Sequence, residues 1–179
     1  MRIRKIHHVA YRCKDTRETV EFYQAVLGMR FLLAISEDRV PSTKAPDPYM
    51  HVFLDAGAGN ILAFFELPNS PPMGRDPNTP DWVQHIAFEL EDEQALMDAK
   101  QELEARGLQV VGPTDHSIIK SIYFFDPNGH RLELTVRTAD AQTLAKLNAV
   151  APEMLTEWTA SKKPVRQAAW LHEREFSQH

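Results

Sequence analysis

The sequence predicts an α+β fold in which two tandem βαβββ modules form a cup-shaped mixed sheet, with a C-terminal helical extension. The main observation is an internal repeat of IHHVAY (residues 6–11) as QHIAF (residues 84–88). In both copies an aspartate follows the aligned histidine, His8 or His85, after seven residues, and a helix-like segment then ends at a glycine. A repeat of this kind defines the folding unit of the chain.

Apolar periodicity places the elements of both modules in the same order. In the first module we expect strands over residues 4–13, 29–36, 49–54 and 60–67, and a helix over residues 17–27. In the second module we expect strands over residues 83–90, 108–112, 117–125 and 130–137, and a helix over residues 93–106. A single domain, residues 1–137, therefore contains module 1 (4–67), a proline-rich linker (68–82) and module 2 (83–137).

Beyond residue 137 the pattern becomes helical, over residues 139–148 and 152–160. We interpret residues 138–179 as a helical arm that covers either a sheet edge or a partner subunit. Open sheets leave edges that natural proteins cover. We therefore expect a homo-oligomer, with a homodimer as the simplest case.

Composition narrows the class of protein. A hydrophobic content of 43% and a charged content of 25% are ordinary for a globular domain. The net charge of −5 argues against nucleic acid as a partner, because phosphate binding requires basic patches. The sequence has a single cysteine, Cys13, which allows no internal disulfide and leads us to expect a cytoplasmic protein. It has no apolar run long enough to span a bilayer, so we expect no membrane partner.

Strand alternation selects the candidate metal ligands. The first and last strands of each βαβββ module can lie side by side, and every second side chain then points into the cup. His8 and His85 occupy equivalent inward positions in the repeat, and Glu133 is inward on the final strand. In this alignment Ala63 is the counterpart of Glu133, whereas Glu66 has the opposite parity and should face away.

Two histidines and one carboxylate match the facial triad that binds Fe(II) and leaves positions open for substrate and O₂. A strand histidine is more often an ordinary core or surface residue. Here the ordinary interpretation would have to treat as coincidence that two histidines occupy equivalent sites of the repeat and that a glutamate lies in an apolar strand. We therefore predict a divalent metal held by His8, His85 and Glu133, with Fe(II) favoured over Mn(II), Ni(II) and Zn(II).

Two other side chains are expected to take no part in this site. His51 precedes Val52, which we align with Tyr123 of the second module, so alternation would turn His51 away from the cup. Cys13 has the parity opposite to His8 and should pack in the core.

The segments HHVAYRCKD, FYQAVLGMRF, QHIAFELED and DPNGHRLEL resemble the vicinal oxygen chelate superfamily of glyoxalases, fosfomycin and bleomycin resistance proteins and type I extradiol dioxygenases. The resemblance covers residues 4–137. It implies the same metal ligands, His8, His85 and Glu133. The glyoxalase I branch usually has a glutamate where Ala63 stands, which favours the dioxygenase branch.

The resemblance also implies two catalytic candidates. Tyr123 lies ten residues before Glu133, where extradiol dioxygenases similarly place a tyrosine that hydrogen-bonds a substrate hydroxyl. His116 is a candidate acid or base, although its offset does not match the family's histidine closely. Each can equally be an ordinary strand residue.

The predicted function is a metal-dependent extradiol-type dioxygenase that cleaves a catechol-like aromatic small molecule with O₂. The alternatives are a glyoxalase I-like lyase or isomerase and a non-catalytic small-molecule-binding protein of the resistance type.

Overall fold

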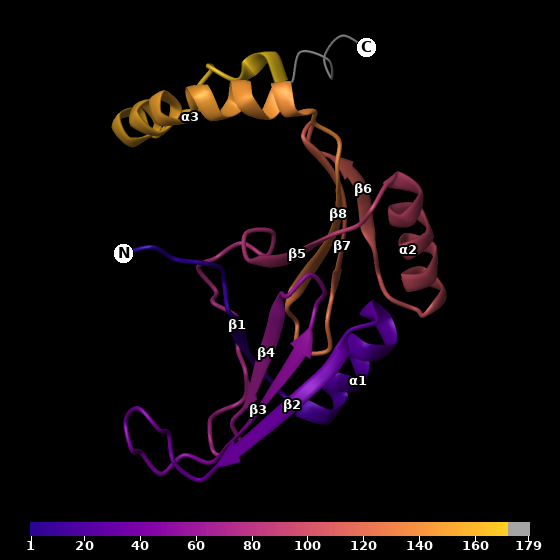
Figure 1. Cartoon of the computed structure of the whole chain (residues 1–179), viewed down its shortest axis with the longest axis vertical. Helices are drawn as coiled ribbons and strands as arrows, with labels where there is room; N and C mark the ends of the chain where they lie inside the picture. The colour runs from indigo at the N-terminus through magenta and orange to yellow at the C-terminus, as the bar shows by residue number, and fades with distance from the viewer. Residues whose placement is uncertain (172–179) are drawn as a thin grey trace. The chain divides into compact units, whose positions relative to one another are not determined.

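The computed structural model describes residues 1–171 and follows the predicted order of elements (Figure 1). The first module contains β1 (Val9–Cys13), α1 (Thr16–Leu27), β2 (Arg30–Glu37), β3 (Tyr49–Asp55) and β4 (Ile61–Glu66). The second contains β5 (His85–Glu89), α2 (Glu93–Ala105), β6 (Val111–Asp115), β7 (Ile119–Phe125) and β8 (Arg131–Arg137). Helix α3 (Ala141–Ser161) and a short 3-10 helix, η1 (Ala169–Leu171), follow. The βαβββ repeat is confirmed.

The strands form two four-stranded mixed sheets with the same topology. Their orders are β1-β4-β3-β2 and β5-β8-β7-β6, so the first and last strands of each module are neighbours, as predicted. In the first sheet β1 pairs with β4 in parallel, and β3 pairs antiparallel with both β4 and β2. The structure therefore confirms the α+β fold with two βαβββ modules.

Local sequence signals fix the ends of α1 and the face of the sheet that it covers. The Asp15 carboxylate accepts a hydrogen bond of 2.8 Å from the backbone N–H of Glu18, which caps the first turn. Gly28 ends the helix with φ of 63°, a left-handed conformation that glycine adopts without steric cost. The buried ring of Tyr23 packs against Phe64 of β4 with centroids 5.0 Å apart. This face of the sheet is therefore the core face.

Two predicted strand boundaries are wrong in ways that affect candidate residues. Strand β1 begins at Val9 rather than at residue 4, so His8 lies just before it. Strand β6 covers residues 111–115 rather than 108–112, and it includes Pro113, whose missing N–H is tolerated because β6 is an edge strand. His116 consequently lies in the β6–β7 turn, where its N–H donates to the carbonyl of Ile119 at 2.8 Å.

The C-terminal arm also differs from the prediction of two separate helices. Helix α3 is continuous through Pro152, while residues 172–179 of the predicted arm lie outside the described residues. A proline inside a helix removes one hydrogen bond and costs about 3 kcal/mol, but its fixed φ is compatible with helical geometry. Among residues 1–171, no helix combines the length and the apolar character needed to cross a bilayer.

By their internal contacts the residues divide into two compact units. The first consists of Met1–Ile86 with Phe125–Leu132, and the second of Ala87–Phe124 with the chain from Glu133 onward. The β7–β8 hairpin turn thus packs with the first module, although the sequence assigns it to the second.

A buried polar network holds this turn in the first unit. Asn128 accepts a 2.8 Å hydrogen bond from the backbone N–H of Lys14 and donates to the hydroxyl of Thr19 at 3.1 Å. The phenol of Tyr23 donates to Asp126 at 3.1 Å. Burial, together with the charge of Asp126, raises the pKa of Tyr23 well above its usual range, so Tyr23 remains a hydrogen-bond donor.

We expect Asn128→Ala to lower the free energy of unfolding by about 1–3 kcal/mol, because it removes the acceptor of the part-buried Lys14 N–H and the amide that donates to the buried Thr19 hydroxyl. Urea unfolding followed by circular dichroism measures the change. Asn78→Ala, in the exposed linker, is the matched control and should shift stability by less than about 0.5 kcal/mol. Equal effects of the two substitutions would contradict the role of the network.

Candidate active site

Glu133, in β8, is more deeply buried than is usual for a carboxylate. Its side chain is 2% exposed, and its neighbours Leu132 and Leu134 are also buried. An ionised carboxylate in such surroundings is costly unless it meets a cation or hydrogen-bond donors. The chemistry of this position therefore fits a metal ligand.

The register of the β7–β8 hairpin places Tyr123 opposite Glu133. The hydroxyl of Ser121 donates to that of Thr135 at 2.9 Å, so these two residues face each other across the hairpin. Tyr123 lies two residues after Ser121 in β7, and Glu133 lies two residues before Thr135 in β8. Because the strands are antiparallel, Tyr123 and Glu133 form the next facing pair and share one face of the sheet. The predicted tyrosine is thus next to the predicted carboxylate ligand.

His116 joins this pair from the β6–β7 turn. Its Nε2 lies 2.7 Å from the hydroxyl of Tyr123, a short hydrogen bond. Sequence reasoning proposed His116 and Tyr123 separately, and the structure brings them into direct contact. Imidazole and phenol can exchange a proton along this bond, which is the arrangement that acid–base chemistry requires.

His85 is the first residue of β5, and its ring orientation fits metal binding. Its Nδ1 lies 3.1 Å from the carbonyl oxygen of Val83. Because a carbonyl only accepts, Nδ1 is the donor in this contact, and the neutral ring of His85 then has its lone pair on Nε2. A backbone carbonyl that fixes the tautomer of a ligating histidine in this way is typical of metal sites.

His8 lies on the face of the first sheet opposite to α1. Its Nδ1 is 2.9 Å from Nδ1 of His7, so one of these two nitrogens donates and the other accepts. Its ring also contacts Phe53 of β3, with centroids 5.6 Å apart. Ala63 of β4 pairs with Phe53, so the position equivalent to Glu133 carries no ligand in this module.

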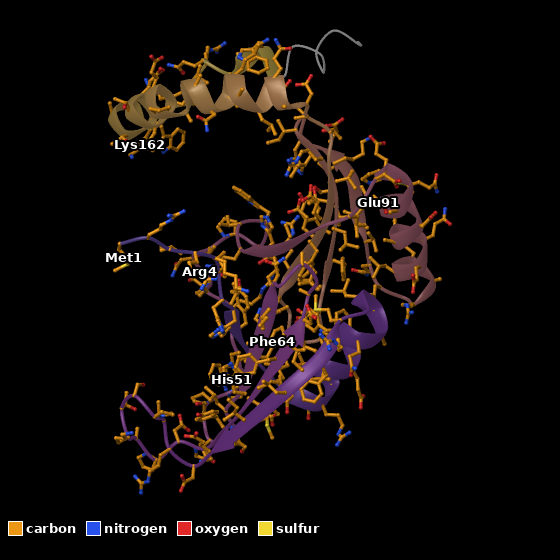
Figure 2. The ribbon with its side chains drawn as sticks, viewed as in Figure 1. Met1, Arg4, His51, Phe64, Glu91 and Lys162 are labelled. Carbon is orange, nitrogen blue, oxygen red and sulfur yellow. The ribbon has the colours of Figure 1, made fainter. Side chains whose placement is uncertain are left out.

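The structure corrects the prediction for His51, which lies on the same face as His8. The two ring centroids are 6.2 Å apart, and His51, which is labelled in Figure 2, stacks on Phe65 with centroids 3.6 Å apart and an interplanar angle of 16°. The error was one residue of alignment. The pair Phe53–Ala63 repeats the pair Tyr123–Glu133, so Phe53 rather than Val52 is the counterpart of Tyr123, and a slip of one residue reverses the face of every side chain.

His51 is nearly enclosed, with 8% of its surface exposed. Its Nε2 is buried and has no hydrogen-bond partner among the described residues. Burial, reinforced by electrostatic repulsion from His8, lowers the pKa of His51 and so favours its neutral ring. The sequence contained a signal for this site, since His51 and Tyr123 both come from the third strand of a module.

The candidate ligands are distributed over both compact units. His8 and His85 belong to the first unit and Glu133 to the second. Within residues 1–171, no three His, Cys, Asp or Glu side chains are already gathered into a metal site. Two imidazoles and a carboxylate match the donor preferences of Fe(II) and related divalent ions, so the residue types fit the metal. Their joint role as ligands stays a prediction.

Glu66 faces the helix side, as the alternation predicted. Its carboxylate accepts hydrogen bonds of 2.7 Å from both the backbone N–H and the hydroxyl of Thr16, at the start of α1. Cys13 shares the core face of the sheet and is 1% exposed. Burial raises the pKa of Cys13 to about 11, so its thiol stays protonated and unreactive.

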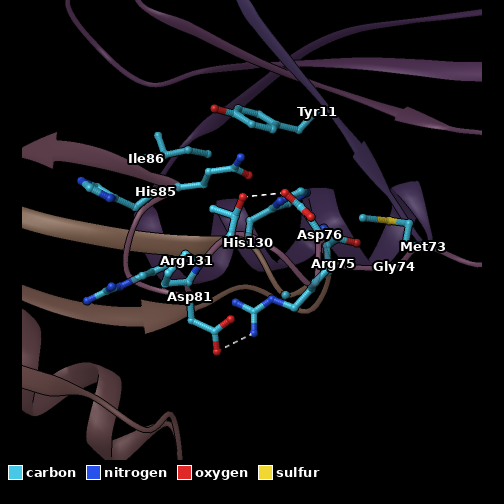
Figure 3. A pocket seen from close by; sticks show the side chains of 15 residues that line it. Tyr11, Met73, Gly74, Arg75, Asp76, Asp81, His85, Ile86, His130 and Arg131 are labelled. Carbon is cyan, nitrogen blue, oxygen red and sulfur yellow. Dashed lines mark hydrogen bonds and ion pairs between the residues drawn. The ribbon is translucent and has the colours of Figure 1, made fainter. Parts of the chain in front are cut away.

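A cavity of about 210 Å³ lies beside His85 in the first unit. It is bordered by Tyr11, His130 and the linker, where Arg75 and Asp81 form an ion pair of 3.1 Å (Figure 3). The imidazole of His130 makes a hydrogen bond within the fold, because its Nε2 lies 2.7 Å from the carbonyl oxygen of Arg12. The cavity therefore adjoins the candidate site through His85 alone.

Comparison with known proteins identifies the family. The sequence model of the Glyoxalase/Bleomycin resistance protein/Dioxygenase superfamily matches residues 5–134. The chain belongs to this superfamily.

Three similar proteins have different descriptions. "Putative ring-cleaving dioxygenase MhqA" of Bacillus subtilis is 27% identical over 139 residues, which is 75% of this chain but 41% of that protein. The chain therefore spans about two fifths of that relative. Metallothiol transferase FosB of Shouchella clausii is 33% identical over 124 residues, covering 63% of this chain and 83% of the transferase. A glyoxalase/dioxygenase of Nostoc punctiforme is 25% identical, with a TM-score of 0.56 and coverage of 76% and 92%.

We expect Glu66→Gln to lower stability by about 1–2 kcal/mol and to leave the metal content of the protein unchanged. The substitution removes a charged acceptor from the N-terminus of α1, where a negative charge is favourable. Thermal unfolding and elemental analysis test the two parts. Glu91→Gln, at an exposed position, is the control, and a loss of metal from Glu66→Gln alone would contradict the orientation of Glu66.

Proposed function

We propose that the protein is a metal-dependent extradiol-type dioxygenase that cleaves a catechol-like aromatic compound with O₂. The observation that carries this proposal is the group of Glu133, Tyr123 and His116 on the second sheet, where a buried carboxylate, a phenol and an imidazole come together. The relative that is named as a ring-cleaving dioxygenase supports the same reaction class.

In this proposal His8, His85 and Glu133 hold the metal, with Fe(II) favoured and Mn(II), Ni(II) or Zn(II) as alternatives. Bound Fe(II) would supply a Lewis acid with adjacent positions for two substrate oxygens and for O₂. The tautomer of His85, set by the carbonyl of Val83, supports its part in this set.

The protein side chains would handle the protons. The hydroxyl of Tyr123 would bond one substrate hydroxyl, and His116 would accept or return a proton through that phenol. His51 provides a second, neutral imidazole, on the face that carries His8. Its Nε2 would accept a hydrogen bond from substrate, which gives this buried nitrogen a partner.

The glyoxalase I-like alternative is less well supported. An isomerase of that type needs a second carboxylate at the metal, and Ala63 occupies the position that would supply it. Glu66 is held by Thr16 on the opposite face of the sheet. The first module therefore offers an imidazole, His51, instead of a carboxylate.

Metal content and ring cleavage test the proposal together. Protein purified without oxygen should contain close to one iron per chain, and His85→Ala should lose it. Tyr123→Phe should retain the iron but consume O₂ on a catechol panel about 10²–10⁴-fold more slowly.

Tyr11→Phe, on the core face of β1, is the matched control and should behave as the native protein. Native protein that holds iron and consumes no O₂ with any catechol would refute the dioxygenase. Native protein that binds no divalent metal after reconstitution would refute the metal set and leave a binding protein.

His51→Phe separates a role in turnover from a role in packing. Phenylalanine keeps the stack on Phe65 and removes the buried nitrogen, so stability should be unchanged or rise by about 1 kcal/mol. Turnover should nevertheless fall at least about tenfold with iron retained. Met50→Leu, a neighbour in β3 with the opposite parity, is the control. Full turnover in His51→Phe would assign His51 to packing only.

A further inference from the structure

The turn between β6 and β7 that carries His116 is very short. The backbone N–H of His116 donates to the carbonyl of Ile119 at 2.8 Å, so only Ser117 and Ile118 reverse the direction of the chain. Two-residue turns between antiparallel strands usually need a positive φ at their first residue, a conformation that favours glycine. The sequence has a serine at this position.

Ser117 adopts the left-handed conformation although it is not glycine. Its φ is 67°, which is unfavourable for a residue with a Cβ atom. The carboxylate of Asp115 accepts a hydrogen bond of 2.7 Å from the backbone N–H of Ser117. An aspartate that bonds the backbone two residues ahead stabilises a turn. Asp115 therefore offsets the strain at Ser117 and fixes the backbone on both sides of His116.

The hydrogen bond between His116 and Tyr123 depends closely on this turn. His116 lies opposite Ile119, and Tyr123 is four residues further along the same face of β7, about 13 Å away along the strand. The position between them on this face is Ser121, whose small side chain leaves room for two rings to meet. The imidazole and the phenol still come within 2.7 Å of each other, with ring planes at 85°. A small rotation of the turn would separate them.

The other residue of the turn is held by the chain that follows β8. The carbonyl of Ile118 accepts hydrogen bonds of 3.0 Å from the N–H of Thr138 and of 3.1 Å from the N–H of Ala139. Backbone bonds thus fix Ile118, and the Asp115 side chain fixes Ser117 beside it. The conformation that presents His116 is therefore held from two directions.

We propose that Asp115 is a positioning residue for the acid–base pair of His116 and Tyr123. Its carboxylate holds the turn in the one conformation from which the imidazole reaches the phenol, and it transfers no proton itself. Only the effect on turnover rests on the proposed function, because the contact of His116 with Tyr123 belongs to the fold.

Nitrogen-15 NMR of the His116 ring tests the positioning without any reaction. In the full-length protein with diamagnetic Zn(II) in place of Fe(II), Asp115→Ala should move the Nε2 signal to the value found in Tyr123→Phe, which lacks the hydroxyl. Asp115→Asn should keep the native signal, because its amide oxygen accepts the same N–H bond. A native signal in Asp115→Ala would overturn the proposal.

The matched control for this experiment is Asp92→Ala in the same unit. Asp92 accepts a similar bond of 2.8 Å from the backbone N–H of Ala95, at the start of α2 and away from His116. Its replacement removes a side-chain cap of the same kind and should leave the His116 signal native. An equal shift in Asp92→Ala and Asp115→Ala would mean a general loss of stability and would also overturn the proposal.

Turnover on the catechol panel gives the second readout. Asp115→Ala should retain the metal and lower kcat about tenfold with little change in KM, and Asp115→Asn should restore it. In the His116→Gln background, Asp115→Ala should cause no further loss, because Asp115 acts through His116. An additive loss there would contradict a positioning role. A native protein that consumes no O₂ but shows the expected NMR shifts would refute the dioxygenase and support the positioning role.

Discussion

The alternation of side chains across β-strands is the constraint on which the site depends. In a module with one face on a helix and one face open, each strand residue belongs either to the core or to the open face. His8 and His51 share the open face of the first sheet, while Glu66 and Cys13 share the core face with α1. The chemistry available to each titratable group follows from this division.

Burial then divides these groups into structural and reactive ones. Glu66 is stabilised by two donors from Thr16, and Asp126 by Tyr23 and Asn128, so both carboxylates are committed to the fold. Glu133 is more deeply buried than Glu66 and lies beside a phenol that an imidazole contacts. Glu66 and Asp126 thus serve stability, whereas Glu133 is the carboxylate that we propose as a metal ligand.

The sequence predicted the order of elements, the pairing of the first and last strands of each module and the orientation of Glu66 correctly, because the repeat and the apolar alternation determine them. It failed where one residue of register mattered. The misaligned third strand assigned His51 to the wrong face, and the early end given to β6 hid the contact of His116 with Tyr123. The β6 error occurred at a proline, which interrupts the alternation, whereas the β3 error was a slip of one residue in aligning the two modules. One-residue shifts in strand alignment and strand ends depend on which backbone groups pair, and the pattern of residue types does not reveal that pairing.

The position of the β7–β8 turn has a consequence for the history and the engineering of the chain. Residues 125–132 are encoded in the second half of the gene but complete the first compact unit, through Asn128 and Asp126. The two repeats therefore do not correspond to two separable folding units. A fragment cut at the linker would lose the turn that satisfies Lys14, Thr19 and Tyr23, so the duplicated halves have become obligate parts of one another.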